Sequence, residues 1–458
     1  MKGHTVLRED ANETLSRVGR GTRMGELFRR YWLPAVLSSE IAEPDCPPLR
    51  LKILGEDLVA FRDTAGRVGI VQAHCPHRLA PLFFGRNEEH GIRCVYHGWK
   101  FDVHGNCLET PNVPPGAPDI RARVGIASYP VEERCGVVWV YMGPEDRRPP
   151  LPDLEYCSLP AENVFAARWL QRTNWSQGLE GEIDSSHISW LHRDFDRGNT
   201  RQKSTGAQLS ADAAPHIELR RTDYGMVYGA RRDHEGQYLW RVTQFLAPMF
   251  SLIPRAPGEF TAGGGRAWVP IDDNSTTVFT FGYNADGPIS QDELDSYYGS
   301  GALFPPRTVK GTFQARDGAV IDTWLPVAAK ENDYEIDREM QRTVNFSGIF
   351  GVHDQDRALA ENSRTIGAAG PGIADRSAEH LVSSDRAVVA ARRILINLAD
   401  RLADGEEPDA PRRPELFRVR AISKISPISG FDEFIDEYGA ECAATSVAPH
   451  DVAAASQP

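Results

Sequence analysis

The spacing of hydrophobic positions changes between the first forty residues and the hundred that follow. Apolar side chains at 24–32 recur at helical intervals, and Pro34 ends the predicted helix because proline disfavours helical backbone in the residue before it. Later runs are short and apolar or alternating, and turn signals such as Gly55 and residues 64–66 separate them. Such runs predict antiparallel strands joined by hairpins. The predicted strands of this part are 49–53, 57–61, 68–73 and 136–141.

The rest of the chain mixes helical and strand-like patterns. Its longest amphipathic run begins near Ser384, a suitable N-cap residue, and stops at Gly405, and a second helix is predicted at about 173–192. The apolar face of the longest helix carries Ala387, Val388, Ala391, Ile394, Leu395 and Leu398. The predicted strands here are 217–221, 225–230, 238–253 and 276–283. Helices and strands in this order indicate an α+β fold.

A chain of 458 residues is long enough for two hydrophobic cores. The proline-rich stretch 144–152 marks the boundary that we predict between them. The predicted division is an N-terminal helical segment 1–40, an all-β domain 41–150, a larger domain 151–442 and a tail 443–458. The tail has little apolar material to pack and is expected to be disordered.

Charge and composition exclude several classes of partner. The sequence has 51 basic and 64 acidic side chains, a formal charge of -13, which argues against nucleic acid or an anionic membrane surface. No apolar run approaches the roughly 20 residues of a membrane span, and the polar start predicts a cytoplasmic protein. Seven cysteines are an odd number for a secreted disulfide framework, so most are expected to be reduced and buried.

Two cysteines are each followed closely by a histidine. Cys75 and His77 form a Cys-x-His pair, and Cys94 and His97 form a Cys-x2-His pair after sixteen intervening residues. Two thiolates and two imidazoles on neighbouring loops fit either zinc or an iron-sulfur cluster. Zinc fingers usually pair cysteine with cysteine, whereas each loop here supplies one ligand of each kind, as a Rieske 2Fe-2S cluster requires. A structural zinc site is the alternative.

A second group of possible ligands lies in the predicted helix 173–192. Asp184 precedes His187 by three residues and therefore shares its helix face, but His192 would lie about 140° away from His187 on an ideal helix. A local bulge would bring the two histidines together. The spacing alone therefore allows either a metal site or ordinary packing and capping roles.

Two motifs together resemble one family. The sequences Cys75-Pro-His-Arg78 and Cys94-Val-Tyr-His-Gly-Trp-Lys-Phe-Asp102 resemble the Rieske domain of aromatic-ring-hydroxylating oxygenases. The downstream pattern Asp-x2-His-x4-His resembles the mononuclear iron site of the same enzymes. The resemblance implies that Cys75, His77, Cys94 and His97 hold the cluster and that His187 and His192 bind iron. It implies that Asp184 bridges His187 and the His97 of a neighbouring subunit.

The resemblance also points to the third iron ligand. Family members commonly show an acid or amide before the liganding aspartate and a glutamate five residues after it, and Gln355, Asp356 and Glu361 match this frame. Asp356 is therefore the predicted ligand, and Asp354 is the reserve. Two histidines and one carboxylate leave open positions on iron for dioxygen and substrate.

The chain looks most similar to the phthalate dioxygenase type, whose oxygenase component has one kind of subunit. Leu79 and Val382 depart from it, because glycine is frequent at both positions. The resemblance implies an N-terminal all-β Rieske domain and a catalytic domain with an antiparallel sheet covered by helices. It also implies a homotrimer or hexamer. It implies a separate flavin or iron-sulfur reductase, or a ferredoxin, because the glycines at 19–25 lack the βαβ setting of an NAD(P)H site.

The predicted reaction uses O2 and reductase-supplied electrons to hydroxylate, by cis-dihydroxylation, an aromatic acid. Arg231, Arg232 and Arg241 are the candidate cations for its carboxylate, although arginines on strands usually face solvent. Three alternatives stay open. They are a monooxygenase or O-demethylase of an aryl ether, a Rieske electron carrier without catalysis, and a zinc-stabilised binding module.

Overall fold

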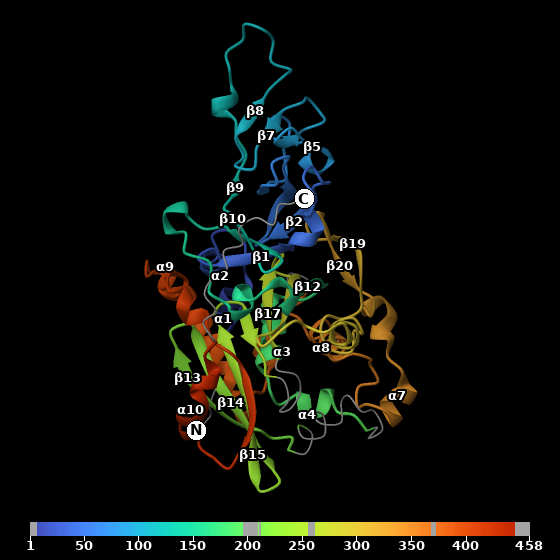
Figure 1. The fold of residues 1–458 in the computed structure, drawn as a ribbon, viewed down its shortest axis with the longest axis vertical. Coiled ribbons are helices and arrows are strands. Elements are labelled where there is room, and N and C mark those ends of the chain that lie inside the picture. The colour runs from blue at the N-terminus through green and yellow to red at the C-terminus, as the bar shows by residue number, and fades with distance from the viewer. Residues whose placement is uncertain (1–6, 196–208, 210–211, 255–261, 368–371, 445–458) are drawn as a thin grey trace.

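The N-terminal part of the computed structural model is built from small antiparallel sheets. The model describes residues 7–195, 209, 212–254, 262–367 and 372–444. Figure 1 shows this part, with strands β5, β7 and β8, projecting at one end of an elongated molecule. Two four-stranded sheets have the orders β2-β3-β4-β9 and β5-β6-β7-β8, and a three-stranded sheet has the order β1-β11-β10. The strands are β1 Trp32–Leu37, β2 Leu49–Ile53, β3 Glu56–Arg62, β4 Val68–Gln72, β5 Arg86–Glu88, β6 Gly91–Arg93, β7 Lys100–Phe101, β8 Cys107–Glu109, β9 Ser128–Tyr129, β10 Val131–Arg134 and β11 Val137–Tyr141.

The turns explain why these residues form hairpins. Leu54 and Gly55 join β2 to β3, and both have positive φ, at 51° and 79°. Two consecutive left-handed residues make the two-residue hairpin whose twist matches that of the strands. At the next turn the Asp63 carboxylate accepts hydrogen bonds from the backbone N–H groups of Ala65 and Arg67. The hairpins predicted at Gly55 and at 64–66 are confirmed.

The second part of the chain is centred on one large antiparallel sheet. Its eight strands have the order β12-β18-β17-β16-β15-β14-β13, and β21 pairs with β15 outside this path. A separate hairpin, β19-β20, lies beside it. The strands are β12 Val164–Gln171, β13 His216–Thr222, β14 Gly225–His234, β15 Gln237–Leu246, β16 Phe250–Leu252, β17 Ala262–Pro270, β18 Thr276–Asn284, β19 Thr308–Gln314, β20 Val320–Pro326 and β21 Ile422–Ser426.

Helices cover this sheet, so the predicted α+β class is confirmed. The long helix α9 packs along β13 and β14, and α3 packs between the sheet and α8 (Figure 1). The helices are α1 Glu9–Ser16, α2 Arg23–Phe28, α3 Trp175–Ile183, α4 Ile188–Leu191, α6 Gln291–Glu293, α7 Arg338–Thr343, α8 Val352–Ala360, α9 Arg386–Ala403 and α10 Phe431–Tyr438. Every residue of α9 that was predicted to face the core is buried or packs against it.

Several predicted boundaries were wrong. The helix predicted at 24–32 ends at Phe28, because the following residues enter β1 and pair with β11. The strand predicted at 238–253 is two strands, β15 and β16, which pair with each other across a tight connection. The sequence analysis missed strands β1, β5 to β10, β12, β17 and β19 to β21. The predicted tail 443–458 lies outside the described residues from 445 onward.

The cysteines were predicted to be mostly reduced, and no helix was predicted to span a membrane. Cys135 and Cys157 are joined in a disulfide, so the expectation of reduced cysteines applies to the other five, of which Cys75, Cys94 and Cys107 are buried. Among the described residues, no helix combines the length and apolarity that a bilayer span requires.

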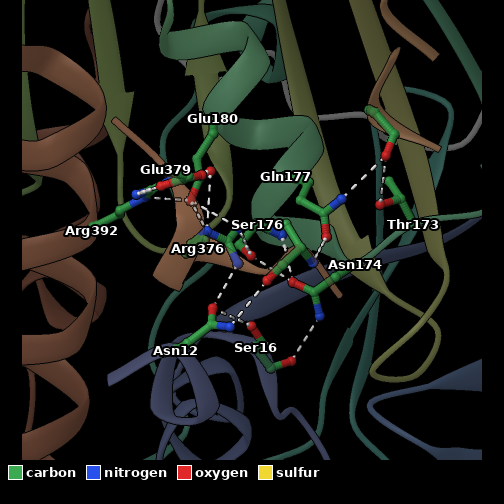
Figure 2. Close-up of polar contacts among 12 residues, drawn as sticks. Asn12, Ser16, Thr173, Asn174, Ser176, Gln177, Glu180, Arg376, Glu379 and Arg392 are labelled. Carbon is green, nitrogen blue, oxygen red and sulfur yellow. Dashed lines mark hydrogen bonds and ion pairs between the residues drawn. The ribbon is translucent and has the colours of Figure 1, made fainter. Parts of the chain in front are cut away.

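A buried network of charges fixes helix α3, which leads into the second group of possible ligands. The Glu180 carboxylate lies between the guanidinium groups of Arg376 and Arg392, at 3.0 Å and 2.8 Å (Figure 2). Arg376 also donates to Asn12 of α1, and Arg392 also pairs with Glu379. Burial alone would raise the pKa of Glu180, but the charges of the two arginines outweigh it and lower the pKa. The network therefore ties α3 to α1 and α9.

Replacing Arg392 with methionine is expected to lower the free energy of unfolding by about 3 kcal/mol, the low end for a broken buried ion pair, because it leaves the partly buried Glu180 and Glu379 without one of their partners. Arg393 is the matched control, since it is adjacent on α9 but exposed, and its methionine variant should unfold like the wild type. The network stabilises the fold above the unfolded pKa of glutamate and loses this contribution as pH falls through the lowered pKa of Glu180. Urea unfolding of both variants at neutral pH tests this, and equal midpoints would contradict it.

Candidate metal centres and substrate cavity

The two cysteine–histidine motifs lie on neighbouring loops with the same local geometry. Cys75 and His77 follow β4, and Cys94 and His97 connect β6 to β7. In each loop the cysteine carbonyl accepts a hydrogen bond from the N–H four residues later, from Leu79 in one and Gly98 in the other, both at 2.9 Å. Both of these residues have positive φ. Leu79 thus occupies a left-handed position that favours glycine, which explains why glycine is frequent at the matching position of the family.

The side chains of the four residues suit a Rieske cluster. The imidazole rings of His77 and His97 lie 4.5 Å apart, and His77 stacks on Trp99 at 4.6 Å. Both cysteines are buried, and burial, with Cys94 close by, raises the pKa of the Cys75 thiol to about 11. The Nδ1 atom of His97 is buried and has no hydrogen-bond partner among the described residues. Buried thiols and an unpaired buried imidazole nitrogen are what metal binding would satisfy.

The helix predicted at 173–192 is interrupted, and this break brings the second group of ligands together. Helix α3 ends at Ile183, and Asp184 has extended backbone, with φ -75° and ψ 111°. A new turn of helix, α4, begins at Ile188. The single helix of the sequence prediction was therefore wrong. Because the chain changes direction at Asp184, the 140° separation of an ideal helix no longer applies to His187 and His192.

Three side chains converge on one point. The Nε2 atoms of His187 and His192 lie 3.2 Å apart, and Oδ1 of Asp356, on α8, lies 3.5 Å from the first and 3.1 Å from the second. These are the described His, Cys, Asp and Glu side chains that gather closely enough for one metal ion, with all ligand atoms within 4.8 Å of one another. Asp354 instead points away and pairs with Arg357 at 2.8 Å. Two imidazoles and one carboxylate match the donor set of a non-haem iron site.

Residues behind the two histidines orient their rings. Asp184 Oδ2 lies 3.4 Å from His187 Nδ1, and Asp184 Oδ1 accepts hydrogen bonds from the backbone and hydroxyl of Ser186. His192 Nδ1 lies 2.6 Å from Oε1 of Gln355, whose amide nitrogen donates to the Ile349 carbonyl. Both contacts leave the Nε2 atoms facing Asp356. Burial disfavours the charged form of His187, yet Asp184 and Asp356 raise its pKa to about 9, so this site attracts positive charge.

A cavity of about 220 Å³ opens beside the three converging side chains. Its wall includes His187, His192 and Asp356 and is otherwise mainly apolar. The apolar and aromatic lining includes Leu209, Ile253, Phe281, Leu303, Phe304 and Val352. A cavity of about 150 Å³ accommodates benzene, whereas drug-sized ligands occupy roughly 300–1,000 Å³. The cavity therefore has the size of a single substituted ring.

The three arginines named from the sequence occupy different places. Arg241, on β15, lines the cavity. Arg232 is fully buried and donates to the Ser185 carbonyl and the Ser189 hydroxyl, so it supports the segment that carries His187. Arg231 donates to the Ser429 carbonyl and lies 4.7 Å from the Tyr238 ring centroid, outside the cavity lining.

A further cation in the cavity wall was missed. Arg266, on β17, forms an ion pair with the buried Glu182 and lies over the Phe304 ring at 3.4 Å. Its strand was not predicted because Gly263, Gly264 and Gly265 interrupt the hydrophobic pattern. No spacing in the sequence connects Glu182 to Arg266, which is 84 residues further on.

Both parts of the chain match families of known proteins. Residues 31–130 match the family model of the Rieske [2Fe-2S] domain, and residues 140–423 match the model described as LigXa C-terminal domain like. The oxygenase subunit of 3-chlorobenzoate-3,4-dioxygenase from Comamonas testosteroni is 40% identical over 91% of this chain and 95% of the relative. The oxygenase subunit of phthalate 4,5-dioxygenase from Pseudomonas putida is 36% identical over 88% of each.

The fold is shared as well. The structure of dicamba monooxygenase bound to 3,6 dichlorosalicylic acid is 19% identical, covers 82% of this chain and 99% of its own, and aligns with a TM-score of 0.55. The predicted all-β Rieske domain and helix-covered antiparallel sheet are thereby confirmed. The matches across both parts show that the chain belongs to the Rieske non-haem iron oxygenases, as an oxygenase component whose cofactors are a 2Fe-2S cluster and a mononuclear iron.

Proposed function

We propose that this oxygenase component hydroxylates a single-ring aromatic acid. The observation that carries the proposal is the position of three iron-ligand atoms, from His187, His192 and Asp356, in the wall of a ring-sized cavity that also contains Arg241. When bound, the cluster supplies single electrons and the iron supplies the site at which dioxygen is activated. A separate reductase or ferredoxin delivers the electrons. Residues 41–150 hold the cluster, through Cys75, His77, Cys94 and His97, and residues 151–442 hold the iron.

A guanidinium group in the cavity wall suits an anionic substrate. Arg241 lies in that wall, beside the mainly apolar lining, where it can bind a substrate carboxylate. A guanidinium group holds a carboxylate with two parallel hydrogen bonds and fixes its orientation. The apolar lining encloses the ring and excludes water from the reacting carbon. Chlorobenzoate and phthalate, the substrates named for the two relatives, have this combination of ring and carboxylate.

Metal analysis and oxygen uptake test this function. We expect about three irons and two acid-labile sulfides per chain, with a Rieske-type spectrum in the reduced protein. Oxygen uptake should depend on substrate in a panel of benzoates and phthalates. A cis-dihydrodiol product would establish dioxygenation, whereas a hydroxylated or dealkylated acid would establish the monooxygenase or O-demethylase alternative. Zinc without sulfide, or the absence of substrate-dependent uptake, would contradict the proposal.

Replacing Arg241 with leucine is expected to raise KM for the aromatic acid about 10–100-fold, because a charged hydrogen bond contributes roughly 1.5–3 kcal/mol. The matched control is Arg231→Leu, which changes an arginine of the adjacent strand outside the cavity lining and should leave KM unchanged. Steady-state oxygen uptake with quantified product provides KM and kcat for each variant. An equal rise of KM in both variants would show that the substitutions disturb the fold and that Arg241 does not bind the substrate.

We also propose that electrons cross between subunits of a cyclic trimer, or of a hexamer made from two trimers. Figure 1 shows the strands that carry the cluster loops at one end of the molecule and α4 towards the other. Exposed apolar side chains lie near both sites, among them Tyr96 beside His97 and Trp190 in α4. Asp184, whose side chain is 23% exposed, is then the bridge between His187 and the His97 of a neighbouring subunit.

A further inference from the structure

A buried histidine lies behind the carboxylate of the proposed iron site. His353 is on α8, three residues before Asp356, so the two side chains share one face of the helix. Its exposed fraction is only 1%, and the rings of Trp169 and Phe304 enclose it at centroid distances of 4.8 Å and 5.1 Å. The imidazole is therefore enclosed by aromatic rings and shielded from solvent.

Trp169 determines which nitrogen of His353 carries the proton. The indole Nε1–H of Trp169 lies 2.8 Å from Nε2 of His353. Because an indole nitrogen only donates, Nε2 must accept, and the single proton of the neutral ring resides on Nδ1. That Nδ1–H is buried and has no hydrogen-bond partner within the described part of the chain. A buried unpaired donor is costly and calls for an explanation.

The two oxygens of Asp356 face different neighbours. Oδ1 lies 3.1 Å from His192 Nε2, in the proposed iron site, whereas Oδ2 lies 4.0 Å from Nδ1 of His353. A separation of 4.0 Å is too long for a hydrogen bond, but the terminal torsion of an aspartate is soft, so a small rotation of the carboxylate shortens it. Such a rotation would satisfy the buried donor.

We propose that His353 is a positioning residue for Asp356, whose Oδ2 accepts a hydrogen bond from the His353 Nδ1–H so that Oδ1 is presented to the metal. Trp169 is part of the device because it fixes the proton on the nitrogen that faces Asp356. The proposal rests on the assignment of Asp356 as an iron ligand. It connects Trp169 on β12, through His353 on α8, to the metal site. Trp169 and His353 then have a role besides packing.

Two amide substitutions separate the two nitrogens of His353. His353→Asn places an amide near the position of Nδ1, where it can donate to Asp356, but it loses the contact with Trp169. His353→Gln places an amide near the position of Nε2, where it can accept from Trp169, but it leaves Asp356 without a donor. If His353 only packs against Trp169, the glutamine variant should be the milder change. Under the proposal the asparagine variant is the milder one.

Ferrous iron affinity is the readout, measured anaerobically by competition with a coloured chelator. We expect about 10–100-fold weaker binding in His353→Gln and near wild-type binding in His353→Asn. The EPR spectrum of the ferrous site with nitric oxide as probe should change in the glutamine variant. Equal affinity in wild type and His353→Gln, or equal loss in both variants, would overturn the proposal. The 2Fe-2S absorbance of each variant reports that the cluster domain is folded, and the thermal unfolding midpoint by circular dichroism reports on the domain that carries His353.

Two further variants keep the outcome decisive. If His353→Asn does not fold, Trp169→Phe is tested in its place. This variant retains His353 but removes the indole N–H donor, so the imidazole proton is no longer confined to Nδ1. Iron affinity should then fall, and unchanged affinity would contradict the proposal. Asp356→Ala separates this inference from the proposed function. If that variant keeps its iron, the ligand assignment fails, whereas loss of iron there with normal affinity in His353→Gln refutes only the role of His353.

Discussion

Asp356→Ala is expected to lose the mononuclear iron and all substrate-dependent oxygen uptake, while the 2Fe-2S cluster stays in place. Oδ1 of Asp356 lies within 3.5 Å of both histidine Nε2 atoms and is the negative charge of the proposed iron site. Loss of a residue that only orients a ligand costs about 10–100-fold in metal affinity or activity, so loss of the ligand itself should cost more. Iron and sulfide analysis, with the reduced cluster's EPR signal, measures both centres in one sample.

Asp354→Asn is the matched control for this prediction. Asp354 is two residues away on the same helix and was the reserve candidate from the sequence. Its side chain is buried and pairs with Arg357 instead of the histidines. The variant should therefore melt at a lower temperature but bind iron normally. Iron loss in Asp354→Asn with retention in Asp356→Ala would reverse the assignment of the ligand.

The sequence contains enough local information to predict the cluster loops. Cys75, His77, Cys94 and His97 occur as two short motifs, and hairpin signals such as Gly55 predict the strands that carry them. The left-handed φ of Leu79 shows why this position is usually glycine, but it could not be derived from the sequence, because leucine rarely adopts that conformation. The loop is held by its hydrogen bond to Cys75 and not by the local preference of its residues.

The iron site was harder to predict because its parts are far apart in the chain. His187 and His192 face each other only because α3 stops at Ile183, and helical periodicity does not reveal that break. Asp356 was reached through resemblance to a family, since nothing in its local sequence distinguishes it from Asp354. Trp169, which contacts His353 from 184 residues away, has no local signal at all.

Asp184→Asn is expected to slow electron delivery between the two centres about 10–100-fold while both remain bound. Asparagine has the shape of aspartate and can still accept from Ser186, so the turn after α3 should persist. It places an amide or a neutral oxygen where the carboxylate faces His187 Nδ1, and the bridge to a second imidazole is lost. Stopped-flow bleaching and recovery of the cluster absorbance, in iron-loaded protein with substrate and dioxygen, measures the rate. Ser186→Ala, which retains the carboxylate, should change this rate little.

Mixed oligomers test whether the Asp184 bridge lies between subunits. A Cys94→Ser subunit should lack the cluster but keep its iron site, and an Asp356→Ala subunit should lack iron but keep its cluster. Neither is active alone. Oligomers assembled from both should recover part of the oxygen uptake, because the cluster of one subunit lies beside the iron site of the next. Recovery that disappears when Asp184→Asn is added to the Cys94→Ser subunit places the bridge at the interface, since that subunit holds the working iron site. If the mixed oligomers form but stay inactive, the electrons travel within one chain and Asp184 serves only to orient His187.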